Sequence, residues 1–319
     1  MRKIIFLNFL FLFFHFFSHL NCEKRFDFSF GFMMNIGENQ EKVFDNGRLL
    51  SLLQWPILPS FNLNIELGLS IPYFHFVFEN SFGIPAFSGM MKDSDYTCPT
   101  SSQKTLFSSH KTTLKENILT SSLIGIPFIV FSSHQKKYSV VLEPQVGFYF
   151  SLKKWHAKDG YTQYKSEDGS KFWKAEWPKK EYNGDGVEYN QKIFFPFIAF
   201  DTRVLIQNKI NMAFSVLFSP LLQGKTKDIH FDTKKIYIDS FSIPSYAFEF
   251  KSIFEKKLSK TISIYTKLKF FYFYSKVGKT TVVQEDTDEE LATYPKGSSG
   301  FEGKELKLTI GISFNASWL

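Results

Sequence analysis

Apolar and polar residues alternate along much of this chain. The segments 26–32, 61–69 and 306–314 place Phe, Leu or Ile at every second position, with polar residues or Gly between them. A period of two is typical of a β-strand that has one apolar and one polar face. Further segments with this alternation are 141–148, 243–250 and 262–273. The pattern predicts an all-β protein.

Aromatic content favours a membrane protein over a soluble β-sandwich. Phe accounts for 40 of the 319 residues, and the segment 270–274 consists of Phe and Tyr alone. Aromatic girdles of this kind are typical of membrane β-barrels. A basic start followed by a short apolar run predicts a signal peptide at 1–22, with a lipidated Cys22 as the alternative to simple cleavage. No later apolar run is long enough for a transmembrane helix.

Residues 23–319 are expected to form a single domain. Its turn positions separate ten strands, which predicts a ten-stranded antiparallel transmembrane β-barrel with extended external loops. The expected strands are 26–44, 48–70, 72–93, 112–131, 137–158, 187–206, 211–229, 236–254, 260–282 and 302–318. The long polar segments, expected as external loops, are 85–111, 158–187, 224–236 and 283–302. Ten strands leave a bore that side chains largely fill, which argues against a wide channel. The polar residues expected to fill it include Asn62, Asn64, Glu66, Glu143 and Gln145.

Charge and cysteine content exclude several functions. The formal net charge is +7, and the lysines are spread over turns and loops. This distribution suits an anionic lipid surface and lacks the dense basic stripe of a nucleic-acid-binding protein. Cys22 and Cys98 are the only cysteines, so neither a disulfide framework nor a zinc site built on cysteine is expected. We expect no metal and no cofactor.

Two polar triplets carry the candidate chemistry, Asp93-Ser94-Asp95 and Asp228-Ile229-His230. Residues i and i+2 of a strand face the same side, so the two residues of each pair, Asp93 with Asp95 and Asp228 with His230, point the same way. Both triplets end outward-running strands, the third and the seventh, at the same rim of the predicted barrel. An imidazole that a carboxylate orients is able to activate a water molecule, with the other carboxyl pair facing it across a groove.

Other interpretations of these residues remain open. Each triplet alone is typical of a solvated strand end. A catalytically silent barrel acting as an adhesin or receptor is the alternative function, because the segments 158–187 and 283–302 are long and polar. Ser108 and His110 follow the first triplet, but no Ser-His-Asp spacing supports Ser108 as the nucleophile of a serine protease. The Trp residues are expected in membrane girdles or in loop packing.

Five segments occur in the order of a known family. Residues 45–55 contain Gly-Arg followed by Ser-x-Leu-x-Trp. The later segments are Met91-Lys92-Asp93-Ser94-Asp95, Ser108-Ser109-His110, Tyr189-Asn190-Gln191-Lys192 with Pro196-Phe197-Ile198, and Asp228-Ile229-His230. With these segments the chain resembles the omptins, a family of outer-membrane aspartate-type endopeptidases.

The resemblance implies an outer-membrane barrel that hydrolyses polypeptides at a site facing the exterior. Asp93 and Asp95 correspond to the family's first catalytic pair, and Asp228 and His230 correspond to its second. The implied mechanism is non-covalent. His230, oriented by Asp228, takes a proton from the attacking water, which the side of Asp93 and Asp95 holds in place.

The resemblance is weaker at the positions that bind substrate and lipid. Glu41 matches one acidic residue of the family's pocket for a basic P1 side chain, whereas Thr226 and Leu106 stand where the family has further acids. We therefore expect Glu41 to be the main anchor for a basic P1 residue and the preference for Arg or Lys to be weaker. Lys192 matches one basic residue of the family's lipopolysaccharide site, so outer-membrane lipid is an expected partner.

Overall fold

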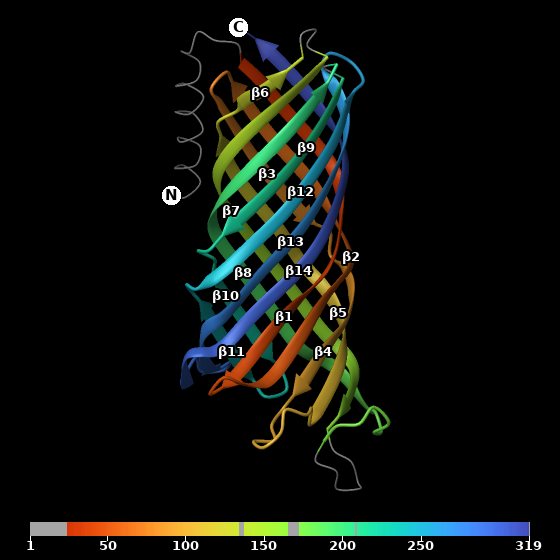
Figure 1. Cartoon of the computed structure of the whole chain (residues 1–319). Helices are drawn as coiled ribbons and strands as arrows, with labels where there is room; N and C mark the ends of the chain where they lie inside the picture. The colour runs from red at the N-terminus through yellow and green to blue at the C-terminus, as the bar shows by residue number, and fades with distance from the viewer. Residues whose placement is uncertain (1–23, 134–136, 165–171, 208, 319) are drawn as a thin grey trace.

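The fold is seen in a computed structural model that describes residues 24–133, 137–164, 172–207 and 209–318 (Figure 1). The expected signal peptide at 1–22, including Cys22, lies outside the described residues. Within the described ranges, no helix is long and apolar enough to cross a membrane.

Strands make up almost all of the described chain. In chain order they are β1 (Lys24–Asp45), β2 (Arg48–Ile71), β3 (Phe74–Gly83), β4 (Ala86–Asp95), β5 (Leu106–Gly125), β6 (Phe128–Ser132), β7 (Tyr138–Gln163), β8 (Lys180–Ile206), β9 (Ile210–Ser219), β10 (Gln223–His230), β11 (Lys235–Phe241), β12 (Ser245–Lys257), β13 (Ile262–Gln284) and β14 (Glu290–Trp318). All named pairs are antiparallel, and the pairing of β1 with β14 and of β7 with β8 closes the sheet into a barrel.

Four of the barrel's strands are each interrupted once, between β3 and β4, β5 and β6, β9 and β10, and β11 and β12. Each interruption contains a proline, namely Pro85, Pro127, Pro220 and Pro244. Proline has no backbone N–H to donate to the ladder, so pairing stops there and resumes beyond it. Counted as continuous strands, the described residues form the ten-stranded antiparallel barrel that the sequence predicts.

The alternation of each strand separates an apolar outer face from a polar inner face. On β14, Leu306 and Ile310 are exposed, whereas Glu305, Lys307 and Thr309 are buried. The outward residues of neighbouring strands meet in register, as Phe30 does with Ile312, and they form an apolar belt around the barrel. Charged residues inside and apolar residues outside are the arrangement of a transmembrane β-barrel.

Ion pairs fill part of the bore at the level of the belt. Glu305 lies between Lys153, to which it is hydrogen-bonded, and Lys307, whose Nζ is 3.2 Å from its Oε2. Glu79 is likewise held by Lys267 at 3.2 Å and by Lys269 at 2.6 Å.

The expected hydrogen-bonded filling is present, since Asn64 donates to Glu79 and Asn62 donates to Ser81, both at 3.0 Å. Gln145 donates to Glu143 at 2.7 Å, and Lys267 is paired with Glu66. Every one of these side chains projects into the bore from the polar face of its strand.

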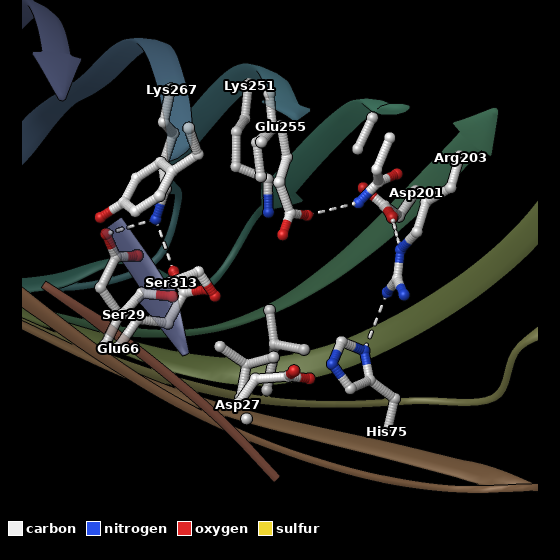
Figure 2. Close-up of a pocket in the computed structure, with 18 of the residues that line it drawn as sticks. Asp27, Ser29, Glu66, His75, Asp201, Arg203, Lys251, Glu255, Lys267 and Ser313 are labelled. Atoms are coloured by element: carbon white, nitrogen blue, oxygen red, sulfur yellow. Dashed lines mark hydrogen bonds and ion pairs between the residues drawn. The ribbon is translucent and has the colours of Figure 1, made fainter. Parts of the chain in front are cut away.

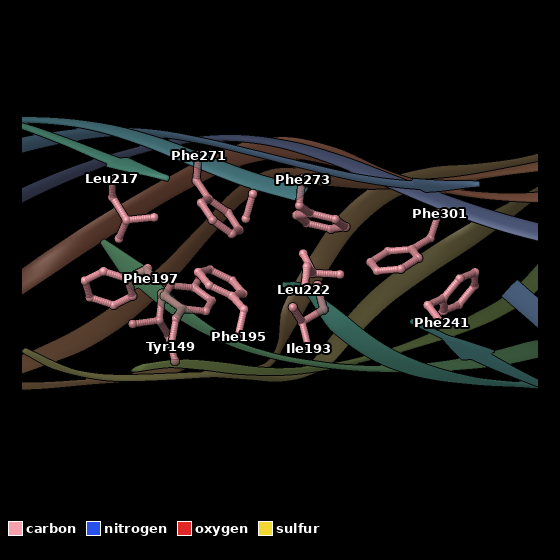
Figure 3. Packing of buried hydrophobic residues seen from close by; sticks show 12 residues of the cluster. Tyr149, Ile193, Phe195, Phe197, Leu217, Leu222, Phe241, Phe271, Phe273 and Phe301 are labelled. Atoms are coloured by element: carbon pink, nitrogen blue, oxygen red, sulfur yellow. The ribbon is translucent and has the colours of Figure 1, made fainter. Parts of the chain in front are cut away.

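Aromatic side chains also fill the bore (Figure 3), and Lys307 lies against the rings of Tyr149 and Phe271. Tyr149 stacks on Phe195 at 4.7 Å and on Phe271 at 4.9 Å between ring centroids, so rings from β7, β8 and β13 meet inside the barrel. Towards the end where β13 begins, a polar cavity of about 140 Å³ remains. There Arg203 donates to Asp201 at 2.7 Å and lies 2.8 Å from the His75 ring (Figure 2). The ion pairs and the aromatic cluster leave no wide channel through this part of the barrel.

Two expectations from the sequence need correction. Much of the segments expected as external loops is strand, because β7 continues to Gln163, β8 begins at Lys180, and β10 and β11 form a hairpin across 224–236. Trp55 and Trp155, expected in a girdle or a loop, are fully buried inside the barrel. Trp173 does pack in the outer region, where its ring lies 5.3 Å from that of Phe107.

Removing the charge of Glu305 leaves two lysines buried without a counter-charge. We expect Glu305→Gln to lower the free energy of unfolding by about 3–5 kcal/mol, the usual cost of breaking a buried ion pair. The exposed Glu289 is the matched control, and Glu289→Gln should change stability by less than about 0.5 kcal/mol. Urea unfolding of the refolded barrel in detergent, followed by heat-modifiable gel migration, measures both. Equal stability of the two variants would contradict a structural role for the ion pairs.

Candidate active site

Both candidate pairs lie at the end of the barrel opposite to the start of β1 (Figure 1). Asp93 and Asp95 are on β4, and Asp228 and His230 are on β10. Both strands lie beyond the prolines that interrupt the wall, outside the apolar belt. Although β4 and β10 are not neighbours in the sheet, the charge of Asp93 acts on His230 and that of His230 on Asp93. The structure therefore brings the two predicted pairs together.

The second pair is a directly bonded imidazole and carboxylate. The His230 Nε2–H group donates to Oδ2 of Asp228 at 2.8 Å. The Asp228 side chain is almost fully buried, whereas a quarter of the His230 side chain is exposed. The ring of Tyr237 packs edge-on against the imidazole at 5.1 Å. Burial by itself lowers the pKa of His230, but the Asp228 carboxylate outweighs it and the pKa rises to about 9.

The first pair is held by a hydroxyl from the neighbouring strand. Ser51 of β2 donates to Oδ1 of Asp93 at 3.3 Å. Burial, and after it the neighbouring charge of Asp95, raises the pKa of Asp93 to about 7. Burial also raises the pKa of Asp95. Near neutral pH the pair therefore holds a proton on Asp93 in part of the molecules, and a protonated carboxyl is able to donate a hydrogen bond.

An aromatic floor lies beneath both pairs. The rings of Trp55 on β2 and Tyr189 on β8 stack at 5.0 Å with an angle of 5° between their planes. Trp155 on β7 packs against both, at 6.1 Å from Trp55 and 5.7 Å from Tyr189. Tyr189 is directly opposite Asp228 in the β8–β10 register. The floor keeps water from the underside of the site, and the low polarity strengthens the electrostatic interactions within the two pairs.

Glu41 lies inside the barrel on β1, and it is 2% exposed. The sequence did not single out Asp239 of β11, which is 1% exposed and whose side chain lies within hydrogen-bond reach of Glu41. In the β10–β11 register Asp239 is directly opposite Thr226. A second acid thus lies beside the position where Thr226 departs from the resemblance. The alternation of residues 236–240 was the signal that could have placed Asp239 on the inner face of a strand. The segment just before these residues was expected to be a loop, so the pairing of β10 with β11 was not foreseen.

The remaining predicted residues occupy separate places. Lys192 of β8 points outward, as its exposure and that of the paired Lys225 show. Ser108 and His110 lie beside the first pair, with 3.1 Å between Oγ and Nε2, and Ser108 is opposite Asp93 in the β4–β5 register. Among the described residues, no group of three or more His, Cys, Asp or Glu side chains is arranged to hold a metal ion.

The structure is similar to the outer membrane protease OmpT from Escherichia coli, with a TM-score of 0.79, 15% sequence identity, and coverage of 92% of this chain and 97% of that one. The outer membrane protein OprG from Pseudomonas aeruginosa aligns with a TM-score of 0.33 and 7% identity over 92% of this chain and 97% of that one. A search of curated proteins found no match.

The likeness to OmpT confirms the fold. A model of the omptin family matches residues 23–316, which is nearly the whole barrel. Because the match extends over so much of the sequence, the chain belongs to the omptin family and its barrel lies in the outer membrane.

Proposed function

We propose that this protein is an aspartate-type endopeptidase, which hydrolyses peptide bonds in the groove between the two catalytic pairs. One observation carries the proposal, the hydrogen bond between His230 and Asp228 in a site that also contains Asp93. Membership of the omptin family and the OmpT-like fold support an outer-membrane protease. The substrates are polypeptides that reach the barrel from outside the cell.

The proposed reaction needs no covalent intermediate. Nε2 of His230 is bonded to Asp228, so the other ring nitrogen, Nδ1, takes a proton from the attacking water. A bond forms between the water oxygen and the scissile carbonyl carbon, and the imidazolium is stabilised by the Asp228 carboxylate. His230 then gives its proton to the leaving amine as the C–N bond breaks. Asp93 and Asp95 accept hydrogen bonds from the attacking water and hold it in place.

Substrate and lipid contacts complete the proposal. Glu41 binds a basic P1 side chain from inside the barrel. On the outer wall, Lys192 and Lys225 are opposite each other, and Phe194 of the apolar belt is two residues away from Lys192 along β8. Paired lysines at the edge of the belt lie at the depth of lipid headgroups, where phosphate groups are found. We propose that they bind lipopolysaccharide.

Loss of His230 should abolish cleavage. We expect the refolded barrel in detergent to cut a fluorogenic peptide library in the presence of lipopolysaccharide, and His230→Ala to lower kcat by at least about 100-fold. His156 offers a matched control, because its Nε2 lies 2.8 Å from Asp185 at the same rim. His156→Ala should keep activity. If the folded wild-type barrel cut no peptide, the adhesin or receptor function would replace the protease.

The activity should increase with pH above neutrality. With a pKa of about 9, His230 is mostly protonated at pH 7, and only its neutral form accepts a proton from water. In a plot of kcat/KM against pH, we expect the apparent pKa of the acidic limb to lie well above the ordinary pKa of histidine. Asp228→Asn removes the carboxylate that raises this pKa, so the limb should move to lower pH while the maximum falls. A limb that stays in place in Asp228→Asn would contradict this account.

Neutralising the outer lysines should weaken the response to lipid. We expect Lys192→Gln combined with Lys225→Gln to raise the lipopolysaccharide concentration needed for half-maximal activity by about 30-fold, since each lysine near an anionic surface contributes about 1 kcal/mol. The exposed Lys209, at the opposite end of the barrel, serves as the control. Titration of lipopolysaccharide against peptide cleavage measures the shift. An unchanged midpoint would exclude these lysines from the lipid site.

A further inference from the structure

The proposed reaction needs a hydrogen-bond donor that the two pairs do not supply. When water adds to the scissile carbonyl carbon, negative charge gathers on the carbonyl oxygen, and a fixed donor aimed at this oxygen stabilises the transition state. Asp93 and Asp95 accept hydrogen bonds from the water, and Asp228 accepts one from His230. His230 itself moves the proton. The donor for the oxyanion therefore has to come from another group of the groove.

Tyr237 of β11 lies beside the imidazole that activates the water. It is directly opposite Asp228 in the β10–β11 register, so both side chains project from the inner face of this hairpin. The Tyr237 ring packs edge-on against the His230 ring, with 5.1 Å between the centroids and 67° between the planes. This contact fixes the tyrosine next to the point of attack. Its side chain is only partly buried, so a substrate in the groove is able to reach it.

The other hydroxyls near the two pairs are engaged or out of reach. Ser51 donates to the first pair at 3.3 Å. Ser108 is 3% exposed and lies 3.1 Å from an imidazole nitrogen. Tyr189 is fully buried in the aromatic floor. Within the described ranges, by contrast, the hydroxyl of Tyr237 is hydrogen-bonded to no protein group. It is therefore available to a ligand.

The Tyr237 hydroxyl also keeps its proton at the pH where His230 acts as a base. With a pKa of about 9, His230 is neutral only in alkaline solution, where a phenol of ordinary pKa near 10 begins to ionise. Burial, and after it the charge of Asp228, raises the pKa of Tyr237 above that value, so the phenol remains a donor. Asp95 on the opposite wall also acts on it, which indicates that the hydroxyl faces across the groove.

We propose that the Tyr237 hydroxyl donates a hydrogen bond to the carbonyl oxygen of the scissile peptide bond and stabilises the negative charge that this oxygen acquires as water attacks. The phenol keeps its proton throughout, so the proton transfers of the reaction stay with His230. The hairpin of β10 and β11 thus provides the base, its orienting carboxylate and the oxyanion donor. This inference rests on the proposed endopeptidase function.

Tyr237→Phe removes the hydroxyl and keeps the ring against His230. The test uses the peptide of the fluorogenic library that the refolded wild-type barrel cuts fastest in the presence of lipopolysaccharide. We expect the variant to lower kcat by about 100- to 1,000-fold, the usual effect of losing one oxyanion donor. KM should change little, because the oxygen carries its charge only in the transition state.

Tyr182→Phe is the matched control. The ring of Tyr182 packs edge-on against His110 at 5.0 Å, in the same outer region of the barrel but away from His230. We expect this variant to keep the wild-type kcat. Because the Tyr237 hydroxyl makes no hydrogen bond to the protein, its removal should leave the fold intact, and heat-modifiable gel migration verifies this for both variants.

The pH profile separates a donor to the oxyanion from a residue that acts through His230. The acidic limb of kcat/KM reports the pKa of His230, so we expect Tyr237→Phe to leave this limb in place and to lower the plateau. The charged and titratable groups that face Tyr237 are the same in the wild type and the variant, namely Asp95, Asp228, His230, Asp232 and Tyr294.

The outcomes distinguish this inference from the proposed function. Three results would overturn the inference while cleavage persists: a wild-type kcat in folded Tyr237→Phe, a loss that a shifted acidic limb accounts for, or an equal loss in Tyr182→Phe. Absence of cleavage by the folded wild type would overturn the proposed function instead.

Discussion

Closure of the strand ladder is the constraint on which the rest of this structure depends. Within hydrocarbon a backbone N–H or C=O without a partner is too costly, so the sheet has to end on itself. The pairing of β1 with β14, from Lys24 with Trp318 to Val43 with Ser299, removes the last free edge. Closure also commits each side chain to lipid or to the bore. Because the wall curves, residues as distant in sequence as Asp93 and His230 lie close enough for their charges to act on each other.

The bore has two regions, which differ in the partners of their charged side chains. At the level of the membrane, Glu305 and Glu79 are each held by two lysines, and the aromatic cluster around Tyr149 packs against Lys307. Towards the outside, Glu41, Asp93 and Asp239 are surrounded by other carboxyls and by one histidine. The first region stabilises the barrel. The second holds groups whose protonation is easily changed, which is what acid–base chemistry and recognition of a cation require.

The sequence was sufficient for the architecture because a period of two is a strong signal. Ten strands, their direction and the outer position of both triplets follow from alternation and turn spacing. Packing inside the barrel was not accessible in the same way. Trp55 and Trp155 look like girdle residues because amphipathic rings suit both a membrane interface and an inner floor. Asp239 was missed because its importance depends on the β10–β11 register, and a polar hairpin at 224–236 has the composition of a loop.

The prolines that interrupt the wall have a further consequence. Pro85, Pro220 and Pro244 lie between the membrane-embedded segments β3, β9 and β12 and the outer segments β4, β10 and β11, which carry both candidate pairs and Asp239. Because the ladder is already broken at these points, a substitution or a bulge in an outer segment need not shift the register of the part in lipid. The membrane-embedded half and the outer half of each of these strands are thus able to diverge separately, so that the candidate site is able to change without altering the assembly of the barrel in the membrane.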